Sequence, residues 1–176
     1  MIPKYADWQQ CVRDYFKIEM RGLDIVELGK GEGTAFLHKH FKSVVSVEYS
    51  RWEYTATWEK GGLPGHILKT LDVPKEYIRH DDLVINTKGR ERNDILKQEA
   101  ERLYREALKH KADVLFIDHG AHNRGEVLDL AKRGAWKYII VHDINQVYYN
   151  YHLESKRHKT TYFRAGQGTA ILKLIE

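Results

Sequence analysis

The sequence predicts an α/β fold in which a doubly wound, mostly parallel sheet ends in an antiparallel C-terminal strand. Two observations lead to this prediction. Continuously apolar runs alternate with helical segments, as in parallel strands that helices bury on both faces. The last two apolar runs, at 160–164 and 169–175, flank a short Gly-Gln-Gly turn that is too short for a crossover helix. They must therefore pair as a hairpin.

The pattern in the first half of the chain predicts helices and strands in alternation. Aromatic and apolar residues at Trp8, Val12 and Phe16 have helical spacing, and Gly22 ends the helix that they predict. An apolar run then leads through a glycine-rich turn into the next helix. In order, we expect a helix at 4–21, a strand at 23–28, a helix at 34–41, a strand at 43–48, a helix at 51–60 and a strand at 82–86.

The second half carries the clearest helical pattern. Leu96, Ala100, Leu103 and Ala107 recur every three or four residues, and charges alternate along the opposite face. Gly134 ends the following helix. Before the hairpin we expect a helix at 91–110, a strand at 112–117, a helix at 123–133, a strand at 137–141 and a helix at 145–155.

Length and composition indicate one globular domain spanning 1–176, since 42% of the 176 residues are apolar and 31% are charged. The single cysteine, Cys11, excludes an internal disulfide framework. No apolar run is long enough to cross a membrane, and the N-terminus lacks the apolar core of a signal peptide. We therefore expect a cytoplasmic protein with no membrane partner.

The charge balance is mildly basic, with 29 Lys and Arg against 25 Asp and Glu. The excess lies in the second half, where residues 156–159 form a basic run. Such a run permits an anionic partner, although a solvated surface is the more common explanation for a run of this size. A second basic group could likewise bind an anionic substrate or belong to a solvated loop: Arg79, Lys88, Arg90 and Arg92.

The turn after the first strand reads Glu-Leu-Gly-Lys-Gly-Glu-Gly, with its glycines at Gly29, Gly31 and Gly33. Glycines here allow a tight turn and the close approach of a ligand. Glu27 would repel a pyrophosphate but attract a cation, which favours S-adenosylmethionine over NAD or FAD. Glu48, at the end of the second strand, can accept hydrogen bonds from two ribose hydroxyls. A glycine turn with unrelated acids is the alternative.

The sequence resembles class I S-adenosylmethionine-dependent methyltransferases over about residues 23–175. The resemblance rests on three stretches: VELGKGEGT, VVSVEYS and the closing RAGQGTAILKLI. The resemblance implies a Rossmann-like sheet of seven strands and transfer of a methyl group to a nucleophile. It also implies an acid near the third strand that contacts adenine, which would be Asp81 or Asp82.

The ends of the fourth and fifth strands carry the candidate reaction centre. Asp118, His142 and Asp143 resemble the metal site of small-molecule O-methyltransferases and cephalosporin-hydroxylase-like proteins, in which Mg²⁺ activates a hydroxyl. Asp118 would border the cofactor as well. His142, which replaces one acid of that pattern, and His119 are candidate proton acceptors.

Other interpretations of this region stay open. Asp118 and His122 could cap the helix that begins at Asn123, and Asp143 could cap the helix that follows it. A zinc site on His119 and His122 lacks a third ligand at a matching spacing. Aromatic residues beyond Glu48 could line an acceptor pocket or pack a helix onto the sheet: Trp52, Tyr54 and Trp58.

The sequence therefore predicts a methyltransferase acting on an oxygen of a small molecule, with or without a metal. A nucleic-acid methyltransferase using the basic C-terminal half and a non-catalytic cofactor-binding protein are the alternatives. The chain shows no large acceptor-binding insertion, so we expect a partner subunit or a second copy of the chain to help recognise the acceptor.

Overall fold

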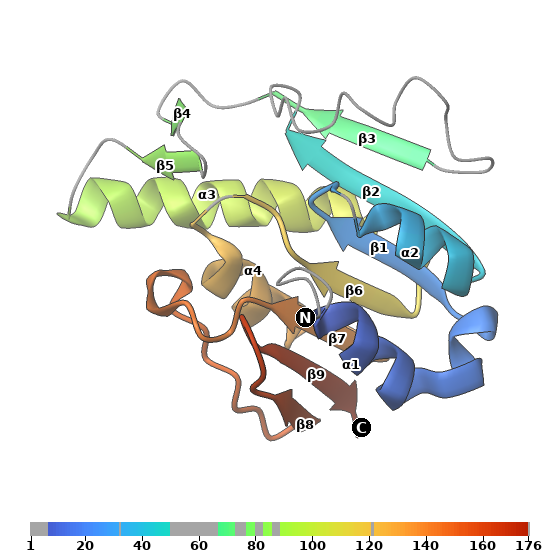
Figure 1. Ribbon diagram of the computed structural model, residues 1–176. Helices are drawn as coiled ribbons and strands as arrows, with labels where there is room; N and C mark the ends of the chain where they lie inside the picture. The colour runs from blue at the N-terminus through green and yellow to red at the C-terminus, as the bar shows by residue number, and fades with distance from the viewer. Residues whose placement is uncertain are drawn as a thin grey trace.

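A computed structural model of the chain describes residues 7–31, 33–49, 67–72, 77–79, 83–85, 89–120 and 122–175. Its centre is one seven-stranded sheet (Figure 1). The strands of this sheet are, in chain order, β1 (Asp24–Leu28), β2 (Ser43–Tyr49), β3 (Ile67–Leu71), β6 (Val114–Ile117), β7 (Tyr138–His142), β8 (His158–Phe163) and β9 (Thr169–Leu174).

The spatial order of the strands is β3-β2-β1-β6-β7-β9-β8. The first five of these strands pair in parallel, whereas β9 is antiparallel to both of its neighbours, β7 and β8. The predicted mixed sheet and its closing hairpin are confirmed. The order also reverses direction between β1 and β6, and a ligand of such a sheet binds beyond the carboxyl ends of the strands at this point.

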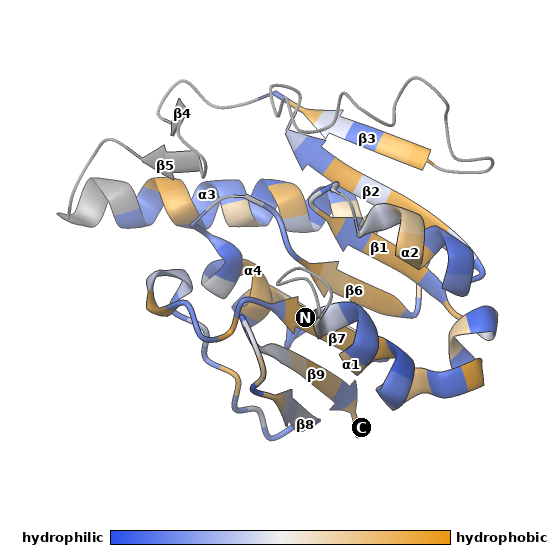
Figure 2. Ribbon diagram, in the orientation of Figure 1, coloured by the Kyte–Doolittle hydropathy of each residue, from blue (hydrophilic) through white to orange (hydrophobic). Residues whose placement is uncertain are grey.

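Helices cover both faces of the sheet because successive strand residues point to opposite sides. Ile25 faces the helices α1 (Asp7–Phe16) and α2 (Thr34–His40), and Val26 faces α3 (Gly89–Leu108) and α4 (Arg124–Ala131). A 3-10 helix, η1, covers Lys17–Gly22 between α1 and β1. Figure 2 shows the result: apolar central strands lie between helices whose outer surfaces are hydrophilic. The hydrophobic effect therefore holds three layers together.

The third strand of the sheet lies elsewhere than the sequence predicted. Residues 83–85 do form a strand, β5 (Leu83–Ile85), but it pairs with β4 (Tyr77–Arg79) in a separate two-stranded sheet. The sheet position belongs to β3, which includes Lys69 and Thr70 and is largely exposed at the edge. An edge strand needs no continuous apolar run, and the criterion used for buried strands therefore missed it.

The helix predicted at 145–155 is also wrong. The chain forms only a short 3-10 helix there, η3 (Val147–Tyr149), and Asn150 adopts a left-handed conformation with φ 49° that ends it. Tyr149 is buried against the start of α4, where a β-carbon on Gly125 would lie 2.4 Å from the Tyr149 carbonyl oxygen. Tertiary packing, rather than local propensity, fixes this segment.

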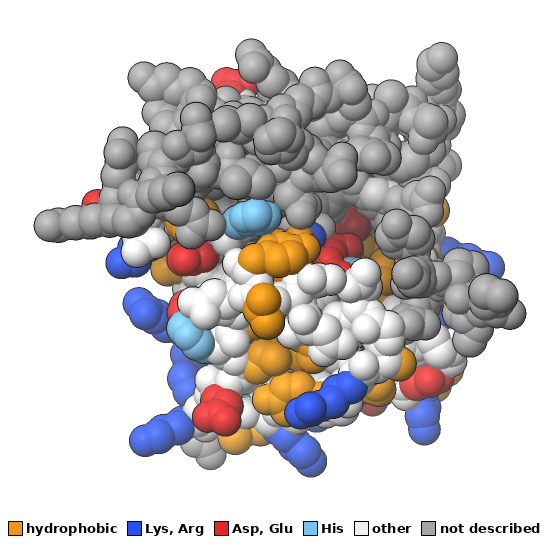
Figure 3. All heavy atoms as spheres, turned by 60° about the vertical axis from the view of Figure 1, so that its left-hand side comes forward, with side chains coloured by type: hydrophobic (Ala, Val, Ile, Leu, Met, Phe, Trp, Pro, Cys, Tyr) orange, Lys and Arg blue, Asp and Glu red, His pale blue; other side chains and the backbone are white. Residues whose placement is uncertain are grey.

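Basic side chains do not gather in one patch on the face that Figure 3 shows; most of the described Lys and Arg residues lie toward its margins. Among the described residues, no helix has the length and apolar character that a membrane crossing requires.

Gly33, which precedes α2, provides a test of how α1 packs. A β-carbon on Gly33 would lie 2.3 Å from Cζ2 of the buried Trp8, although its φ of −70° suits any residue. We expect Gly33→Ala to lower the free energy of unfolding by about 1–3 kcal/mol, because the Trp8 ring must move within a packed core.

Gly31→Ala is the matched control, since nothing lies within 4 Å of a β-carbon there. It should leave the free energy of unfolding unchanged or raise it by up to about 1 kcal/mol. Urea denaturation of both variants measures the difference, and equal stabilities would contradict the packing of Trp8 described here.

Candidate active site

Side chains from four neighbouring strands meet at the carboxyl edge of the sheet. Glu27 lies in β1 and Glu48 in β2, Asp118 follows β6, and His142 ends β7 just before Asp143. Because these strands are parallel and adjacent, their carboxyl ends share one edge. The topology thus brings together the residues that the sequence singled out.

The glycine turn brings β1 close to the end of β6. Gly29 has a φ of +96°, and a β-carbon on it would lie 2.7 Å from the backbone oxygen of Asp118. Glycine is therefore required at this position both by conformation and by contact. Gly31 instead borders open space, which leaves its backbone accessible to a ligand. Gly33 is needed for Trp8, and this role was not predicted.

Glu48 is held by the glycine turn itself. Its Oε2 accepts a hydrogen bond from the Lys30 backbone N–H at 2.8 Å, and its Oε1 accepts one from the Tyr49 N–H at 2.7 Å. Burial raises the pKa of Glu48 to about 7, although these two bonds act in the opposite direction. Each oxygen keeps a second lone pair, so the carboxylate can still accept hydrogen bonds from two ribose hydroxyls.

Glu27 is buried, and two hydroxyl groups donate hydrogen bonds to its carboxylate. Ser46 donates to its Oε2 at 2.6 Å, and Thr34, the first residue of α2, donates at 2.9 Å. Burial raises the pKa of Glu27 to about 8, and the nearby Asp118 and Glu48 raise it further against these hydrogen bonds. Three acids therefore crowd one edge of the sheet, an arrangement that suits a cationic ligand.

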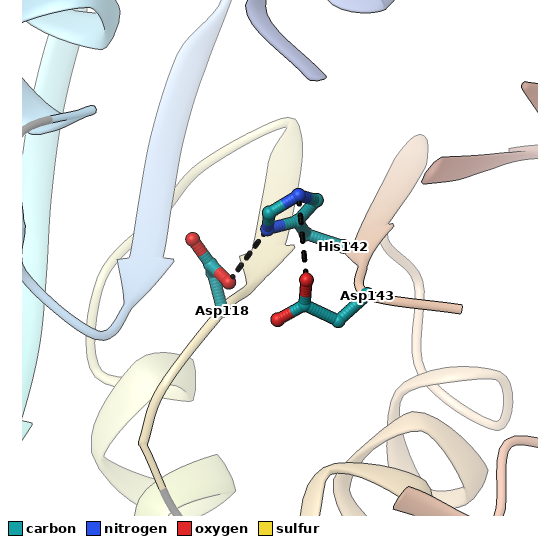
Figure 4. Close-up of side chains that lie close together, drawn as sticks. All are labelled: Asp118, His142 and Asp143. Carbon is teal, nitrogen blue, oxygen red and sulfur yellow. Dashed lines mark hydrogen bonds and ion pairs between the residues drawn. The ribbon is translucent and has the colours of Figure 1, made fainter. Parts of the chain in front are cut away.

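Asp118, His142 and Asp143 form a compact cluster (Figure 4). His142 Nδ1 lies 3.0 Å from Asp118 Oδ1, a hydrogen bond, whereas Nε2 lies 3.5 Å from Asp143 Oδ1. The imidazole is thus fixed by Asp118 through Nδ1. Its Nε2 has only a long contact with Asp143 and remains the more available nitrogen.

Arg124 joins the two carboxylates of this cluster. Its Nη1 lies 3.1 Å from Asp118 Oδ1 and 3.0 Å from Asp143 Oδ2. Its Nε donates to the backbone oxygen of His119, and its guanidinium lies 4.1 Å from the centre of the Tyr149 ring. Arg124 is almost completely buried, with 4% of its surface exposed.

Opposite charges within the cluster shift the pKa values of its members. Burial opposes ionisation of Asp118, but His142 and Arg124 together outweigh it and lower the pKa of Asp118. Burial likewise disfavours a charged His142, yet Asp118 and Asp143 raise the pKa of His142 above its usual value. Burial raises the pKa of Asp143, although His142 and Arg124 oppose the change.

Asp143 has a strained backbone conformation, with a φ of 59° in the left-handed region that residues with a β-carbon rarely adopt. Backbone bonds from Ile144 and Asn145 to the turn between β8 and β9 hold the following residues in place. The closing hairpin thereby directs the Asp143 side chain toward His142 and Arg124.

The structure also bears on the two alternative interpretations, helix capping by Asp118 and a zinc site on His119 and His122. The N-cap residue of α4 is Asn123, and no side chain forms a capping hydrogen bond at this helix end. Asp118 bonds to His142 and Arg124 instead, so the interpretation of Asp118 as a helix cap is wrong. His119 is fully buried, its Nε2 lies 2.8 Å from Asn123 Oδ1, and burial lowers the pKa of His119 to about 3. His122 contacts the Tyr148 ring, and neither histidine belongs to the cluster.

Several predicted residues lie outside the described residues. They are the adenine-contact candidates and the aromatic residues beyond Glu48: Asp81, Asp82, Trp52, Tyr54 and Trp58. The side chains of Arg79, Lys88, Arg90 and Arg92 are likewise not described.

Sequence reasoning missed Arg124, although one signal was available. Arg124 is the first residue of α4, where the positive end of the helix dipole favours an acid rather than a base. A basic residue at this position requires a compensating acid, and Asp118 stands six residues earlier.

Comparison with known proteins adds information at the level of the fold. No protein-family model matches the sequence, and no curated protein matches it. A solved structure of a methyltransferase-like protein from Silicibacter pomeroyi is similar over 99% of this chain and 87% of its own, with 15% identity and a TM-score of 0.63.

A methyltransferase from Geobacter sulfurreducens is similar over 96% of this chain and 78% of its own, with 16% identity and a TM-score of 0.55. A putative caffeoyl-CoA O-methyltransferase from Staphylococcus aureus is similar over 95% of this chain and 82% of its own, with 10% identity and a TM-score of 0.53. This chain has the class I methyltransferase fold. The predicted resemblance is confirmed for the fold, and the chemistry follows from the site.

A divalent metal fits the cluster by distance but not by charge. One ligand atom each from Asp118, His142 and Asp143 lies within 4.8 Å of the others. However, Asp118 Oδ1 already contacts both His142 and Arg124, and a second cation there would face a buried guanidinium. Mg²⁺ also prefers oxygen ligands to imidazole. The residues present therefore do not fit the Mg²⁺ that the resemblance implies.

The buried Glu27 predicts how stability depends on pH. Its pKa is about 8 in the folded chain and 4.5 ordinarily, so between these values the folded state binds a proton that the unfolded state has released. Glu27 therefore makes stability fall as the pH rises from 5 to 8, and we expect Glu27→Gln to remove on the order of 3 kcal/mol of this contribution. His119, whose pKa is lowered to about 3 from an ordinary 6.5, acts in the opposite direction at the acidic end of this range.

Urea denaturation at pH 5, 6, 7 and 8 measures this effect. Glu48 contributes in the same direction, so the wild-type slope should be reduced rather than abolished in Glu27→Gln. The control is the exposed Glu154, whose change to Gln should leave the slope unchanged. Equal pH slopes for the wild type and Glu27→Gln would contradict this picture of Glu27.

Proposed function

We propose that this protein is an S-adenosylmethionine-dependent methyltransferase that transfers a methyl group to an oxygen of a small molecule. The observation that carries the proposal is the placement of a hydrogen-bonded Asp118–His142 pair beside the buried acids Glu27 and Glu48 at the switch point of a class I methyltransferase sheet. The acids supply a site for a cation, and the pair supplies a base next to it.

The cofactor fits the β1 and β2 side of this edge. S-adenosylmethionine carries an ammonium and a sulfonium. Asp118, whose pKa is lowered, provides an opposite charge, and a bound cation would favour ionisation of Glu27 and Glu48 by opposing the rise in their pKa values. The open backbone at Gly31 allows close approach of the methionine part, and Glu48 keeps lone pairs for the ribose. When bound, the cofactor supplies the electrophilic methyl group.

The acceptor would lie on the β7 side, against His142. Since Nδ1 is bonded to Asp118, the imidazole Nε2 takes the proton of the acceptor hydroxyl as its oxygen becomes the nucleophile. Asp118 and Asp143 then stabilise the imidazolium that forms. Positioning supplies much of the rate, because methyl transfer needs the oxygen in line with the sulfonium. No step uses a metal.

Calorimetric titration with S-adenosylhomocysteine tests the cofactor half. We expect a Kd in the micromolar range. Glu48→Ala should weaken binding at least about 10-fold because it removes the acceptor of the ribose hydroxyls. Gly31→Arg should abolish binding because its side chain would fill the open space.

The matched control is Gly22→Arg, since Gly22 has equally open surroundings but precedes β1, at the opposite edge of the sheet. Its affinity for S-adenosylhomocysteine should equal that of the wild type. Absence of binding by the wild type would overturn the proposed function.

Transfer of a tritiated methyl group tests the acceptor half. Panels of phenols, hydroxy acids and sugars, together with total RNA, would be incubated with labelled S-adenosylmethionine. We expect label on a small-molecule hydroxyl, and His142→Gln should lower kcat by about 10²–10⁴-fold while S-adenosylhomocysteine affinity is retained. The exposed His152 provides the control His152→Gln.

Other results have clear meanings. Label on RNA, with an affinity that falls steeply with salt, would favour the nucleic-acid alternative. Cofactor binding without any transfer would favour a non-catalytic protein. Full activity of His142→Gln would remove His142 from the reaction centre.

A further inference from the structure

Arg124 bridges the two carboxylates of the cluster, as a shared metal ion would. A cation shared by Asp118 and Asp143 must contact an oxygen of each, and Arg124 Nη1 does so at 3.1 and 3.0 Å. One nitrogen atom thus bridges the end of β6 and the end of β7. The two carboxylate side chains are 27% and 19% exposed, whereas that of Arg124 is only 5% exposed.

The rest of the guanidinium is also committed. Its Nε donates to the His119 backbone oxygen, its Cζ lies 4.1 Å from the centre of the Tyr149 ring, and its charge acts on the pKa of the nearby Tyr151. Tyr151 in turn donates to the backbone oxygen of His142 at 3.0 Å. Together with Asp118 and Asp143, these partners come from three separate parts of the chain, so Arg124 cannot move aside without breaking a buried network.

Charge leads to the same conclusion. Two acids and one arginine leave a single negative charge, which His142 can balance by accepting a proton. A divalent ion added to this set would leave an excess of positive charge and would lie next to a guanidinium in a buried site. An arginine and a metal are therefore alternatives at this position rather than partners.

The geometry points to Arg124 as a built-in replacement for the divalent metal, a fixed organic cation that holds Asp118 and Asp143 in place around His142. The site then has no divalent-cation requirement, and Arg124 is a positioning residue that acts through the two acids. Only the assignment of this cluster as a reaction centre rests on the proposed function. The exclusion of a metal by Arg124 does not.

Binding of Mn²⁺ tests the inference directly, with the loss of the free-ion electron paramagnetic resonance signal as the readout. We expect the wild type to show no stoichiometric site up to millimolar Mn²⁺. Arg124→Gln keeps much of the side chain but removes its charge, so it should expose Asp118, His142 and Asp143 and bind one Mn²⁺ at least 10-fold more tightly than the wild type. The double variant Arg124→Gln/Asp118→Asn should lose that site.

Arg105→Gln, on the exposed face of α3, is the matched control and should not bind Mn²⁺. Circular dichroism verifies that each variant is folded, and Arg124→Met, which also keeps the aliphatic stem, replaces Arg124→Gln if the latter is unfolded. Stoichiometric Mn²⁺ binding by the wild type that Asp118→Asn removes would overturn the inference. Folded Arg124 variants that gain no Mn²⁺ site would overturn it as well.

Titration of the same proteins with S-adenosylhomocysteine separates the two claims. Failure of the wild type to bind that ligand would remove the proposed function without affecting the Mn²⁺ result. We expect the affinity of the wild type for S-adenosylhomocysteine to be the same with Mn²⁺ and with EDTA, and a marked dependence on Mn²⁺ would again argue against Arg124 as the replacement.

Discussion

The double ion pair of Arg124 with Asp118 and Asp143 is the interaction on which the rest of the site depends. It links the end of β6, the end of β7 and the start of α4, and through Tyr149 and Tyr151 it fixes the segment after β7. A buried ion pair of this kind contributes little net stability, because desolvation offsets the attraction. Its effect is to define one geometry for the groups around it, including the imidazole of His142.

Asp118 connects the two halves of the site. It raises the pKa of Glu27 and Glu48 on the cofactor side and hydrogen-bonds to His142 on the acceptor side. Its backbone oxygen also requires glycine at position 29, which sets the path of the turn beneath the proposed cofactor. A single residue at the switch point of the sheet thus couples the charge that favours a cationic ligand to the base that would activate the acceptor.

The sequence predicted the sheet and its closing hairpin because both depend on local signals: apolar runs for the buried strands and a short turn for the hairpin. It also brought Asp118, His142 and Asp143 together, since parallel strands share a carboxyl edge. It missed β3, whose exposed edge position removes the apolar signal, and the non-helical segment around Tyr149, which packing against α4 determines. It missed Arg124 because a bridge between two strand ends depends on the relative placement of β6, β7 and α4, which no local pattern contains.

A crystal structure of the protein with S-adenosylmethionine is the most direct test of this account. The account predicts the ribose on Glu48, the methionine part beside Gly31, and the sulfonium methyl group directed into the space next to His142 Nε2. An acceptor oxygen placed between them would then lie about 3–3.5 Å from the methyl carbon. A nucleoside bound away from Glu48, or a methyl group turned away from His142, would contradict it.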